Sequence, residues 1–449
     1  MKDLSLTTVA QMMQAHFAGP DARYQGLCID TRNLKPGDLF VALEGEHVDG
    51  HDYINMAEKR GAAGLVISRP VDSTIATLLV PNTLEALALF AKAMRARFPI
   101  PMVAITGSSG KTTIKEMLYS ILSLKGPTLA TTDNLNNEIG VPLTLSRLNT
   151  EHWAAIIEMG ARRQGNIAYL MSLANPNVGL ISNASMAHVE IFGSTQNIAE
   201  AKAEIYKNLR PSGIAILNVD EAHADLWRSM MNKPAKIISF GLKNKADVYA
   251  DNIVLDKHGS FCDLHIDGKV LALTLQAPGE HSIYNALAAA ASATALGVEL
   301  ETIQKGLQLF SAVSGRLEFK KGRLDTCIID DTYNANPASM QAALAVLARQ
   351  PGFRIFVMGD MLELGDQALD YHQIIGLAAK KYGIDKLYGF GKMTRAAVAA
   401  FGEGGAYFSD QNSLIEKLFL EMPREATLLV KGSRGMKMEN IVRHLMNGE

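Results

Sequence analysis

Short apolar runs of strand length alternate with segments of helical spacing along most of this chain. Residues 102–105 are apolar throughout and are bounded by turn residues, which is typical of a buried strand. From 114 to 124 the apolar side chains recur every three or four positions, which predicts a helix with one buried face. Apolar runs return at 154–159, 178–181 and 214–218. This alternation predicts an α/β protein with mainly parallel sheets, whose ligands bind at the carboxyl ends of the strands.

The same pattern divides the chain into three predicted domains. Residues 1–82 combine an amphipathic helix, predicted at 4–17, with short strands, and indicate a small α/β domain. Residues 83–312 hold a mostly parallel sheet and then a β-rich stretch at 248–275, which predicts an antiparallel extension. Residues 313–449 repeat the strand–helix alternation and predict a Rossmann-like, doubly wound sheet. The full length agrees with a prior of ~150 residues per domain.

The segment between the strand at 102–105 and the helix at 114–124 carries the clearest chemistry. In its form T-G-x-x-G-K-T-T, glycines let backbone N–H groups approach phosphate oxygens, the lysine adds positive charge, and a hydroxyl can bind Mg²⁺. It departs from the common G-x-x-x-x-G-K-[ST] pattern, because Ile105 stands where the first glycine would be. We predict a nucleotide-phosphate site in a P-loop ATPase domain; the alternative is a tight turn whose lysine is only solvated. The residues of this site are Gly107, Ser108, Ser109, Gly110, Lys111, Thr112 and Thr113.

Polar side chains near the ends of other predicted strands are further candidates. Glu158 ends a strand beside the glycine-rich turn, where a second metal ligand belongs. A loop with Asn134, Asn136 and Asn137 can hydrogen-bond a substrate, although asparagine also favours turns for local reasons. His188 follows a later strand, and a lone histidine is more often packed or solvated than a ligand.

Two loops combine basic and hydroxyl side chains. Thr31 and Arg32 are adjacent on a loop of the first domain, and an arginine beside a hydroxyl suits a phosphate or a carboxylate. Lys431, Ser433 and Arg434 lie just past a strand of the third domain, where they can reach an anion across a cleft between domains. For both loops the spacing alone is equally compatible with a solvated turn.

Composition and charge exclude several classes of function. The formal net charge is −2 and no basic tract is present, so we expect no nucleic-acid partner. No run of ~18 apolar residues occurs, and the first residues include an acid, so we expect neither a membrane span nor a signal peptide. Cys28, Cys262 and Cys327 are widely spaced and odd in number, which fits a reducing cytoplasm without disulfides. We predict a cytoplasmic protein and expect a monomer.

Taken together, the motifs of the chain resemble those of the Mur ligase family. They follow the family's order over nearly the whole chain: TGSSGKTT, NLNNEIGVPLTL, IIEMGA, AHVEIFGS, AKAEIY, PGEHSIYNALAAAA, GRLE, DDTYNANPASM, GDMLELG and VKGSRGMKME. The resemblance implies an ATP-dependent enzyme of peptidoglycan synthesis that forms an amide through an acyl phosphate. TYNANP in place of a YAHTP-like segment, and the absence of a DNPR motif, favour the member that joins D-alanyl-D-alanine to the UDP-N-acetylmuramoyl-tripeptide.

The resemblance also implies roles for single residues. Lys111 would bind the β- and γ-phosphates of ATP, and Thr112 would bind Mg²⁺. Glu158 and His188 would hold metal near the acyl phosphate, and Lys202, otherwise a solvated helix lysine, would carry a carbamate that turns it into a metal ligand. Asn285, Arg316 and Asp331 would bind the nucleotide, and Tyr333, Asn334 and Asn336 would contact the dipeptide. Phosphate or substrate contacts would come from Lys431, Ser433 and Arg434. The uridine end would be bound by Thr31 and Arg32.

Two other functions agree with parts of this pattern. Another amide ligase of the same architecture, such as a diaminopimelate- or lysine-adding enzyme or a folylpolyglutamate synthase, would use ATP with a different acceptor. A P-loop switch or motor would hydrolyse ATP without any amine. That second alternative lacks a Walker B run of apolar residues ending in aspartate, and it leaves the third domain without a role. The dependence of ATP use on different amines separates these possibilities.

Overall fold

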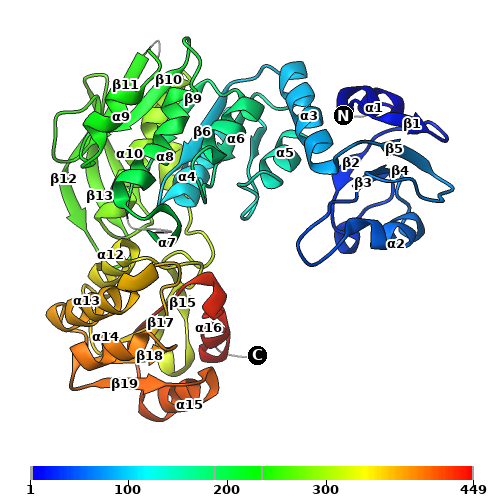
Figure 1. The fold of residues 1–449 in the computed structure, drawn as a ribbon. Helices are drawn as coiled ribbons and strands as arrows, with labels where there is room; N and C mark the ends of the chain where they lie inside the picture. Colours follow the sequence, from blue (N-terminus) through cyan, green and yellow to red (C-terminus); the bar gives the residue numbers. More distant parts are fainter. Residues whose placement is uncertain (1–3, 186–188, 234–235, 447–449) are drawn as a thin grey trace.

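A computed structural model shows three α/β units in chain order, each built on its own sheet (Figure 1). It describes residues 4–185, 189–233 and 236–446. The predicted fold class is confirmed: a small N-terminal α/β unit, a mostly parallel central sheet and a Rossmann-like C-terminal sheet. Within the described residues, no helix has the length and apolar character needed to cross a membrane.

The N-terminal unit is a five-stranded sheet in the order β1-β5-β4-β3-β2, parallel except for β1. Ser5 caps the first helix by accepting a hydrogen bond from the backbone of Thr8, and Gln14 ends it in a left-handed conformation (φ 55°). The helix predicted at 4–17 is therefore wrong beyond Met13, because the next residues pair with β5 instead. The elements are α1 (Leu6–Met13), β1 (His16–Ala18), β2 (Gly26–Cys28), η1 (Thr31–Asn33), β3 (Asp38–Val41), η2 (Gly50–Tyr53), α2 (Ile54–Lys59), β4 (Gly64–Ile67) and β5 (Ala76–Leu79).

The central unit is a nine-stranded sheet in the order β14-β13-β12-β11-β10-β9-β6-β8-β7. Its strands are parallel from β7 to β12 and antiparallel from β12 to β14, which confirms the extension predicted at 248–275. The elements are α3 (Thr83–Arg97), β6 (Met102–Thr106), α4 (Lys111–Ser123), β7 (Thr128–Ala130), α5 (Gly140–Leu145), β8 (Ala154–Glu158), α6 (Asn166–Ala174), β9 (Val178–Ile181), α7 (Val189–Phe192), α8 (Thr195–Lys207), β10 (Ile214–Asn218), α9 (Ala224–Met230), β11 (Lys236–Gly241), β12 (Val248–Leu255), β13 (Ser260–Ile266), β14 (Lys269–Leu275), α10 (Glu280–Ala295) and α11 (Leu300–Leu309).

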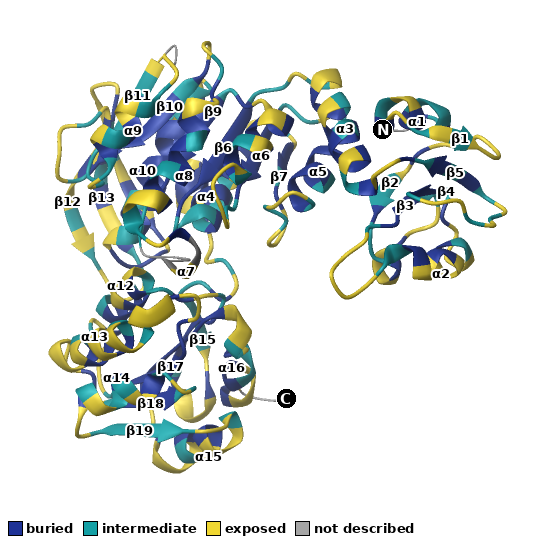
Figure 2. Ribbon diagram, in the orientation of Figure 1, coloured by how far each residue is buried: buried dark blue, intermediate teal, exposed yellow. Residues whose placement is uncertain are grey.

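Helices cover both faces of the central sheet, and the sheet itself is buried (Figure 2). On one face, α4, α10 and α11 pack on the strands; the small side chains of α10, with Ala286 and Ala290 fully buried, let this helix lie close to them. On the other face, α3, α5, α6, α8 and α9 form a second core, in which Trp227 is fully buried. Burial on both faces explains why these strands are continuous apolar runs rather than alternating ones.

The C-terminal unit is a six-stranded sheet in the order β15-β16-β20-β17-β18-β19, parallel except for β15. Its apolar core lies on both faces of the sheet, as a doubly wound fold requires. The elements are β15 (Glu318–Lys321), η3 (Arg323–Asp325), β16 (Cys327–Asp331), α12 (Pro337–Leu347), β17 (Arg354–Gly359), η4 (Gly365–Gln367), α13 (Ala368–Lys381), β18 (Lys386–Phe390), α14 (Thr394–Phe401), β19 (Gly405–Phe408), α15 (Gln411–Glu421), β20 (Thr427–Lys431), η5 (Arg434–Met436) and α16 (Glu439–Leu445).

The turn between β12 and β13 joins the central unit to the C-terminal unit. The side-chain Nε2 of Gln350, which is buried, donates a hydrogen bond to the carbonyl of Lys257 at 2.8 Å. Beside it, the rings of His258 and Phe319 meet edge to face with centroids 5.0 Å apart. The antiparallel extension therefore supports the C-terminal unit from one side, while the strand ends of the two sheets border the cavity described next.

Candidate active site

One cavity of about 1460 Å³ is lined by residues from all three units. The central unit contributes the loops after β6, β8, β9 and β10, the C-terminal unit contributes the loops after β16 and β20, and the N-terminal unit reaches it through Glu46. Ligands of α/β sheets bind at such carboxyl ends. The predicted site residues that line the cavity are Gly107, Ser108, Ser109, Gly110, Lys111, Thr112, Thr113, Asn134, Asn136, Asn137, Glu158, Lys202, Asn285, Arg316, Asp331, Tyr333, Asn334, Asn336, Lys431, Ser433 and Arg434.

The glycine-rich turn has the backbone geometry of a phosphate cradle. Gly110 is left-handed (φ 83°), and a Cβ there would lie 2.5 Å from Oδ1 of Asn285, so only glycine fits. Asn183 holds the turn from the neighbouring strand end, because its carbonyl accepts from the N–H of Ser108 and its side chain accepts from the N–H of Ser109. Helix α4 begins directly after this turn, so its first N–H groups have no acceptor within the helix and suit an anion.

Lys111 is a half-buried cation whose hydrogen bond goes to a neutral group. Its Nζ donates to the carbonyl of Gly107 at 2.7 Å, which folds the side chain back over the turn. Burial lowers the pKa of the Lys111 ammonium; Glu158 works against this shift, and the positive charge of Arg316 adds to it. An incoming phosphate would compensate this charge far better than a carbonyl does.

Next to Lys111 in the cavity, Thr112 and Glu158 supply two adjacent oxygen atoms that could bind a metal ion. The hydroxyl of Thr112 donates to Oε2 of Glu158 at 2.9 Å, and the amide of Asn136 donates to Oε1 at 2.9 Å. Glu158 is only 2% exposed, and the backbone N–H of Glu158 is held by the hydroxyl of Thr131. A buried carboxylate that receives neutral donors, next to a hydroxyl, matches the oxygen ligands that Mg²⁺ prefers.

Lys202 lies on α8 and is also buried, at 5% exposed. Burial, together with the positive charge of Lys111, lowers the pKa of the Lys202 ammonium to about 7. The alternative of a solvated helix lysine is therefore wrong. His188, predicted as its companion metal ligand, lies outside the described residues.

Arg316 connects the C-terminal unit to the start of α4. Its guanidinium donates to the hydroxyl of Thr112 at 2.9 Å and lies 4.2 Å from the ring centroid of Tyr333. Arg434 approaches the same ring at 5.8 Å. The Nε of Arg316 is buried and has no hydrogen-bond partner among the described residues. The arrangement places two guanidinium groups and one aromatic face on the wall of the cavity.

Lys431 ends β20 and is paired rather than free. Its Nζ lies 2.6 Å from the carboxylate of Asp331 and donates to the backbone carbonyl of Asn334 at 2.9 Å. Asp331, predicted at the ribose, also accepts from the N–H of Leu317. The hydroxyl of Ser433 accepts from a loop N–H at Leu362. These contacts arrange the strand ends of the C-terminal unit around the exposed Asn334.

The three loop asparagines have different roles in the structure. Asn136 supports Glu158, as described above. Asn137 accepts from the N–H groups of Ile139 and Gly140, so its side chain forms the turn into α5. Asn134 lies on the cavity wall. The turn interpretation is thus correct for Asn137, and substrate contact stays a prediction for the loop.

Thr31 and Arg32 are not brought to the cavity. They lie on η1 of the N-terminal unit, where the guanidinium of Arg32 is bound to the carboxylate of Asp30 at 2.6 Å. The Arg32 side chain is 86% exposed. A ligand that used both regions would need to extend from η1 to the cavity.

Sequence reasoning missed His281, which lines the cavity near Asp331 and Lys431. Burial lowers the pKa of His281 to about 4, so its imidazole is neutral near pH 7. His281 precedes Asn285 by four positions on α10, and this i, i+4 spacing places both on one face of the helix. The spacing between His281 and Asn285 was the feature of the sequence that could have identified His281 as a site residue.

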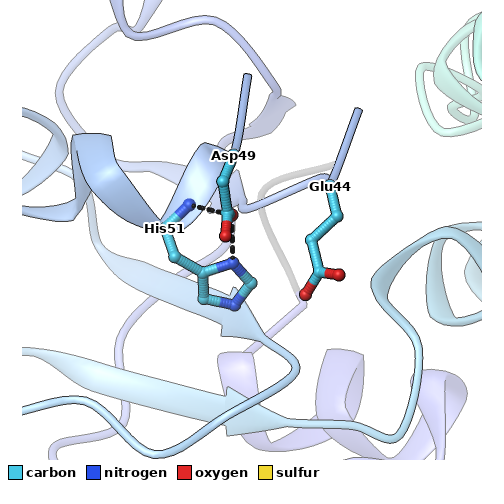
Figure 3. A group of neighbouring side chains, drawn as sticks. All are labelled: Glu44, Asp49 and His51. Carbon is cyan, nitrogen blue, oxygen red and sulfur yellow. Dashed lines mark hydrogen bonds and ion pairs between the residues drawn. The ribbon is translucent and has the colours of Figure 1, made fainter. Parts of the chain in front are cut away.

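Outside the cavity, Glu44, Asp49 and His51 form a compact group in the N-terminal unit, named here the acid–histidine cluster (Figure 3). Their ligand atoms lie within 4.8 Å of one another, as in a metal site. Both ring nitrogens of His51 are already used, since Nδ1 bonds Asp49 at 2.7 Å and Nε2 accepts from the N–H of Ser68. Arg69 supplies the positive charge, bonding Asp49 at 2.6 Å. The cluster is therefore an ion-pair network that holds the loop carrying Glu46.

Comparison with known proteins agrees with this geometry. The chain matches the "Mur ligase family, catalytic domain" over residues 23–98, the "Mur ligase middle domain" over 105–293 and the "Mur ligase, glutamate ligase domain" over 315–434. It is 42% identical to the UDP-N-acetylmuramoyl-tripeptide–D-alanyl-D-alanine ligase of Escherichia coli, with 99% of each chain covered. A protein of the same name from Haemophilus influenzae is 38% identical, also with 99% of each chain covered.

Solved structures give the same result. MurF from Acinetobacter baumannii superposes with a TM-score of 0.92 at 37% identity and 98% coverage of both chains. MurF from Thermotoga maritima, solved in complex with ADP, superposes with a TM-score of 0.81 at 27% identity, covering 94% of this chain and 97% of that one. Identity above 30% along the full length, together with the three domain matches, shows the family. The chain belongs to the Mur ligase family.

Proposed function

We propose that this protein joins D-alanyl-D-alanine to a UDP-N-acetylmuramoyl-tripeptide with the use of ATP, as its relatives' names state for them. The observation that carries the proposal is one shared cavity, in which the phosphate cradle of one sheet and the basic strand end of another line the same space. A ligase needs this arrangement, because a nucleotide, a carboxylate and an amine must meet in one place.

The reaction has two steps. The terminal carboxylate of the tripeptide attacks the γ-phosphorus of ATP, which forms an acyl phosphate and releases ADP. The amine of the dipeptide then attacks the acyl carbon, an amide bond forms, inorganic phosphate leaves and the amine loses a proton. Both steps bring anions together, so positioning and charge neutralisation supply most of the rate enhancement.

The cations of the cavity have separate tasks in this proposal. Lys111, now bonded to the Gly107 carbonyl, turns to the β- and γ-phosphates when ATP binds. Arg316 stabilises the transferring phosphoryl from the C-terminal unit, since it already reaches Thr112. Asn285 packs on the cradle, and we assign Asp331, which lines the cavity, to the nucleotide sugar. The exposed amide of Asn334, whose backbone carbonyl is bonded to Lys431, receives the dipeptide.

Mg²⁺ fits the cavity through Thr112 and Glu158, whose oxygens are adjacent and buried. When bound, this ion supplies positive charge at the phosphates. We also propose that Lys202 reacts with carbon dioxide, losing a proton and forming a carbamate whose oxygens would add to this set of ligands. Its burial and lowered pKa support this modification, because only a neutral amine can react.

The remaining assignments are proposals as well. The N-terminal domain, residues 1–82, holds the uridine end near Thr31 and Arg32, residues 83–312 bind ATP, and residues 313–449 bind the dipeptide. The protein acts as a cytoplasmic monomer. The separation between η1 and the cavity suits a long substrate, since a UDP-linked tripeptide can span two sites that a small molecule cannot.

The test is phosphate release in the presence of ATP, Mg²⁺ and UDP-N-acetylmuramoyl-tripeptide, with and without D-alanyl-D-alanine. We expect release to depend on the dipeptide and the product mass to equal tripeptide plus dipeptide minus water. Diaminopimelate, lysine and glutamate serve as matched alternative amines. Release with one of these instead would indicate another Mur-type ligase or a folylpolyglutamate synthase, and release without an amine would indicate an ATPase.

A further inference from the structure

Besides the bond from Arg316 to Thr112, a second hydrogen bond connects the C-terminal unit directly to the phosphate cradle. The side-chain Nδ2 of Asn336 donates to the hydroxyl oxygen of Ser109 at 2.9 Å. The two residues are 227 positions apart in the chain and belong to different sheets. This contact can form only when the C-terminal unit lies against the central unit, so it reports their relative position.

Asn336 is held rigidly on its own side of the contact. Its Oδ1 accepts from the backbone N–H of Ser339 at 2.8 Å, and the hydroxyl of Ser339 accepts from the backbone N–H of Asn336 at 3.0 Å. This reciprocal pair is a capping box at the start of α12. The cap fixes the carbonyl end of the Asn336 amide and thereby orients its NH₂ group toward the cradle.

Ser109 is held equally well on the other side. Its carbonyl accepts from the hydroxyl of Ser182 at 2.6 Å and from the amide of Asn183 at 3.1 Å, and its N–H donates to Asn183. The backbone is thus tied to the end of β9. A hydroxyl both accepts and donates, so while its oxygen receives the N–H of Asn336, its own proton remains to be donated to a phosphate oxygen.

We propose that Asn336 is a positioning residue that couples docking of the C-terminal unit to phosphate binding in the cradle, acting through the Ser109 hydroxyl. The inference rests on the proposed function for its meaning in catalysis. A donor on Ser109 Oγ polarises its O–H and strengthens the bond to phosphate. Because such coupling is reciprocal, bound phosphate favours the docked unit by the same factor by which docking favours phosphate.

The coupling has a consequence for the second substrate. Asn334 precedes the α12 cap by two positions, and its carbonyl is bonded to Lys431. Asn334, the proposed contact of the dipeptide, therefore moves together with Asn336, which bonds the cradle. Asn336 was predicted as a contact of the dipeptide, but both polar atoms of its side chain are used by the cap and by Ser109. We assign it to interdomain positioning instead.

The test distinguishes the role of Asn336 as the N-cap of α12 from its hydrogen bond to Ser109. Asn336→Ser keeps a good N-cap, but its shorter side chain cannot reach Ser109. Ser109→Ala removes the acceptor, and Ser339→Ala is the matched control that weakens the capping box without touching the cradle. We would measure the affinity for the ATP analogue AMPPCP by calorimetry on the full-length protein, and then kcat and the KM for D-alanyl-D-alanine.

Asn336→Ser and Ser109→Ala should each weaken AMPPCP binding about 3- to 10-fold, the range of one neutral hydrogen bond, and lower kcat similarly. The double variant should be no worse than either single one. Ser339→Ala should lower thermal stability with AMPPCP affinity kept within about twofold.

Multiplying effects in the double variant would overturn the coupling, and so would a rise in the dipeptide KM alone, which would make Asn336 a ligand of the dipeptide. The AMPPCP measurements need no dipeptide. If the wild-type protein released no dipeptide-dependent phosphate, the proposed function would fail while the binding data still decided the coupling.

Discussion

The cavity and the acid–histidine cluster both gather charged side chains, but they balance charge in opposite ways. In the cluster, Arg69 is bonded to both carboxylates, and both histidine nitrogens have partners. In the cavity, the half-buried Lys111 lies near the buried Lys202, and its positive charge lowers the pKa of Lys202. Lys111 has only a carbonyl as its hydrogen-bond partner among the described residues.

This difference distinguishes a structural group of charges from a binding site. In the acid–histidine cluster the carboxylates are already neutralised by Arg69, so the cluster gains nothing from a ligand and stabilises the local chain. Cations that are shielded from water, with no bonded carboxylate among the described residues, are costly for the folded protein, and an anion or a chemical modification relieves that cost. The spacing of ligand atoms alone would have favoured the cluster as a metal site, whereas the hydrogen-bond partners of its atoms exclude that interpretation.

The largest expected effect is that of removing the charge of the cradle. Lys111→Ala should leave a folded protein and lower kcat by at least about 10³-fold, because the lysine stabilises charge on the transferring phosphoryl, and such contacts contribute several kcal/mol. Phosphate release and circular dichroism check both parts. Lys125→Ala, just beyond α4 and stacked on Trp153, is the control lysine and should keep full activity. A Lys111→Ala variant with most of its kcat would mean that the cavity cations are structural after all.

The next effect concerns the buried Lys202. Lys202→Ala should lose activity by about 10²-fold or more and regain part of it with acetate or formate, since a small carboxylate replaces the carbamate oxygens. Labelled bicarbonate should give a carbamate carbon signal in the wild-type protein only. Lys207→Ala, on the exposed side of the same helix, is the matched control. Full activity of the Lys202→Ala protein would sink the carbamate proposal.

A smaller effect is expected at the edge of the cavity. Asn334 is exposed, and its side chain accepts only from the next backbone N–H among the residues that the structure describes, so we take its NH₂ group as available to the dipeptide. Asn334→Ala should raise the KM for D-alanyl-D-alanine about 3- to 10-fold and leave the KM for ATP unchanged. Initial rates at varied dipeptide concentration measure this. If only the KM for ATP rises, Asn334 belongs to the nucleotide side of the cavity.

The smallest catalytic effect should come from the acid–histidine cluster. Hydrogen bonds from the backbone of His51 and from Arg69 hold the pKa of Asp49 well below its usual value. The carboxylate therefore stabilises the folded state above about pH 4, its unfolded value, and this contribution is lost as the pH falls further. Asp49→Asn should cost at most about 1 kcal/mol at pH 7, with kcat within about twofold, and should flatten the fall in stability below pH 4. Thermal unfolding from pH 3 to 7 checks this; a large loss of kcat would place the cluster in the active site.

Local patterns predicted most of the fold. Strand and helix positions in all three units follow from apolar runs and helical spacing, and the antiparallel extension at 248–275 was visible in the same way. The prediction failed at the end of α1, where residues of helical spacing leave the helix to pair with β5. That choice depends on a strand about 60 positions away along the chain, which no local pattern contains.

The residues of the site also fall into two groups, those that follow from the local sequence and those that depend on distant residues. The sequence by itself determined the phosphate cradle, because its glycines, its lysine and the start of α4 are contiguous and their geometry is local. Only the tertiary structure decided that Lys202 is buried near Lys111, that His281 and Asp331 line the same cavity, and that the amide of Asn336 bonds Ser109 rather than remaining free. Burial and hydrogen-bond partners arise from residues far apart in the chain, and they set both the pKa of a side chain and which of its atoms remain available to a ligand.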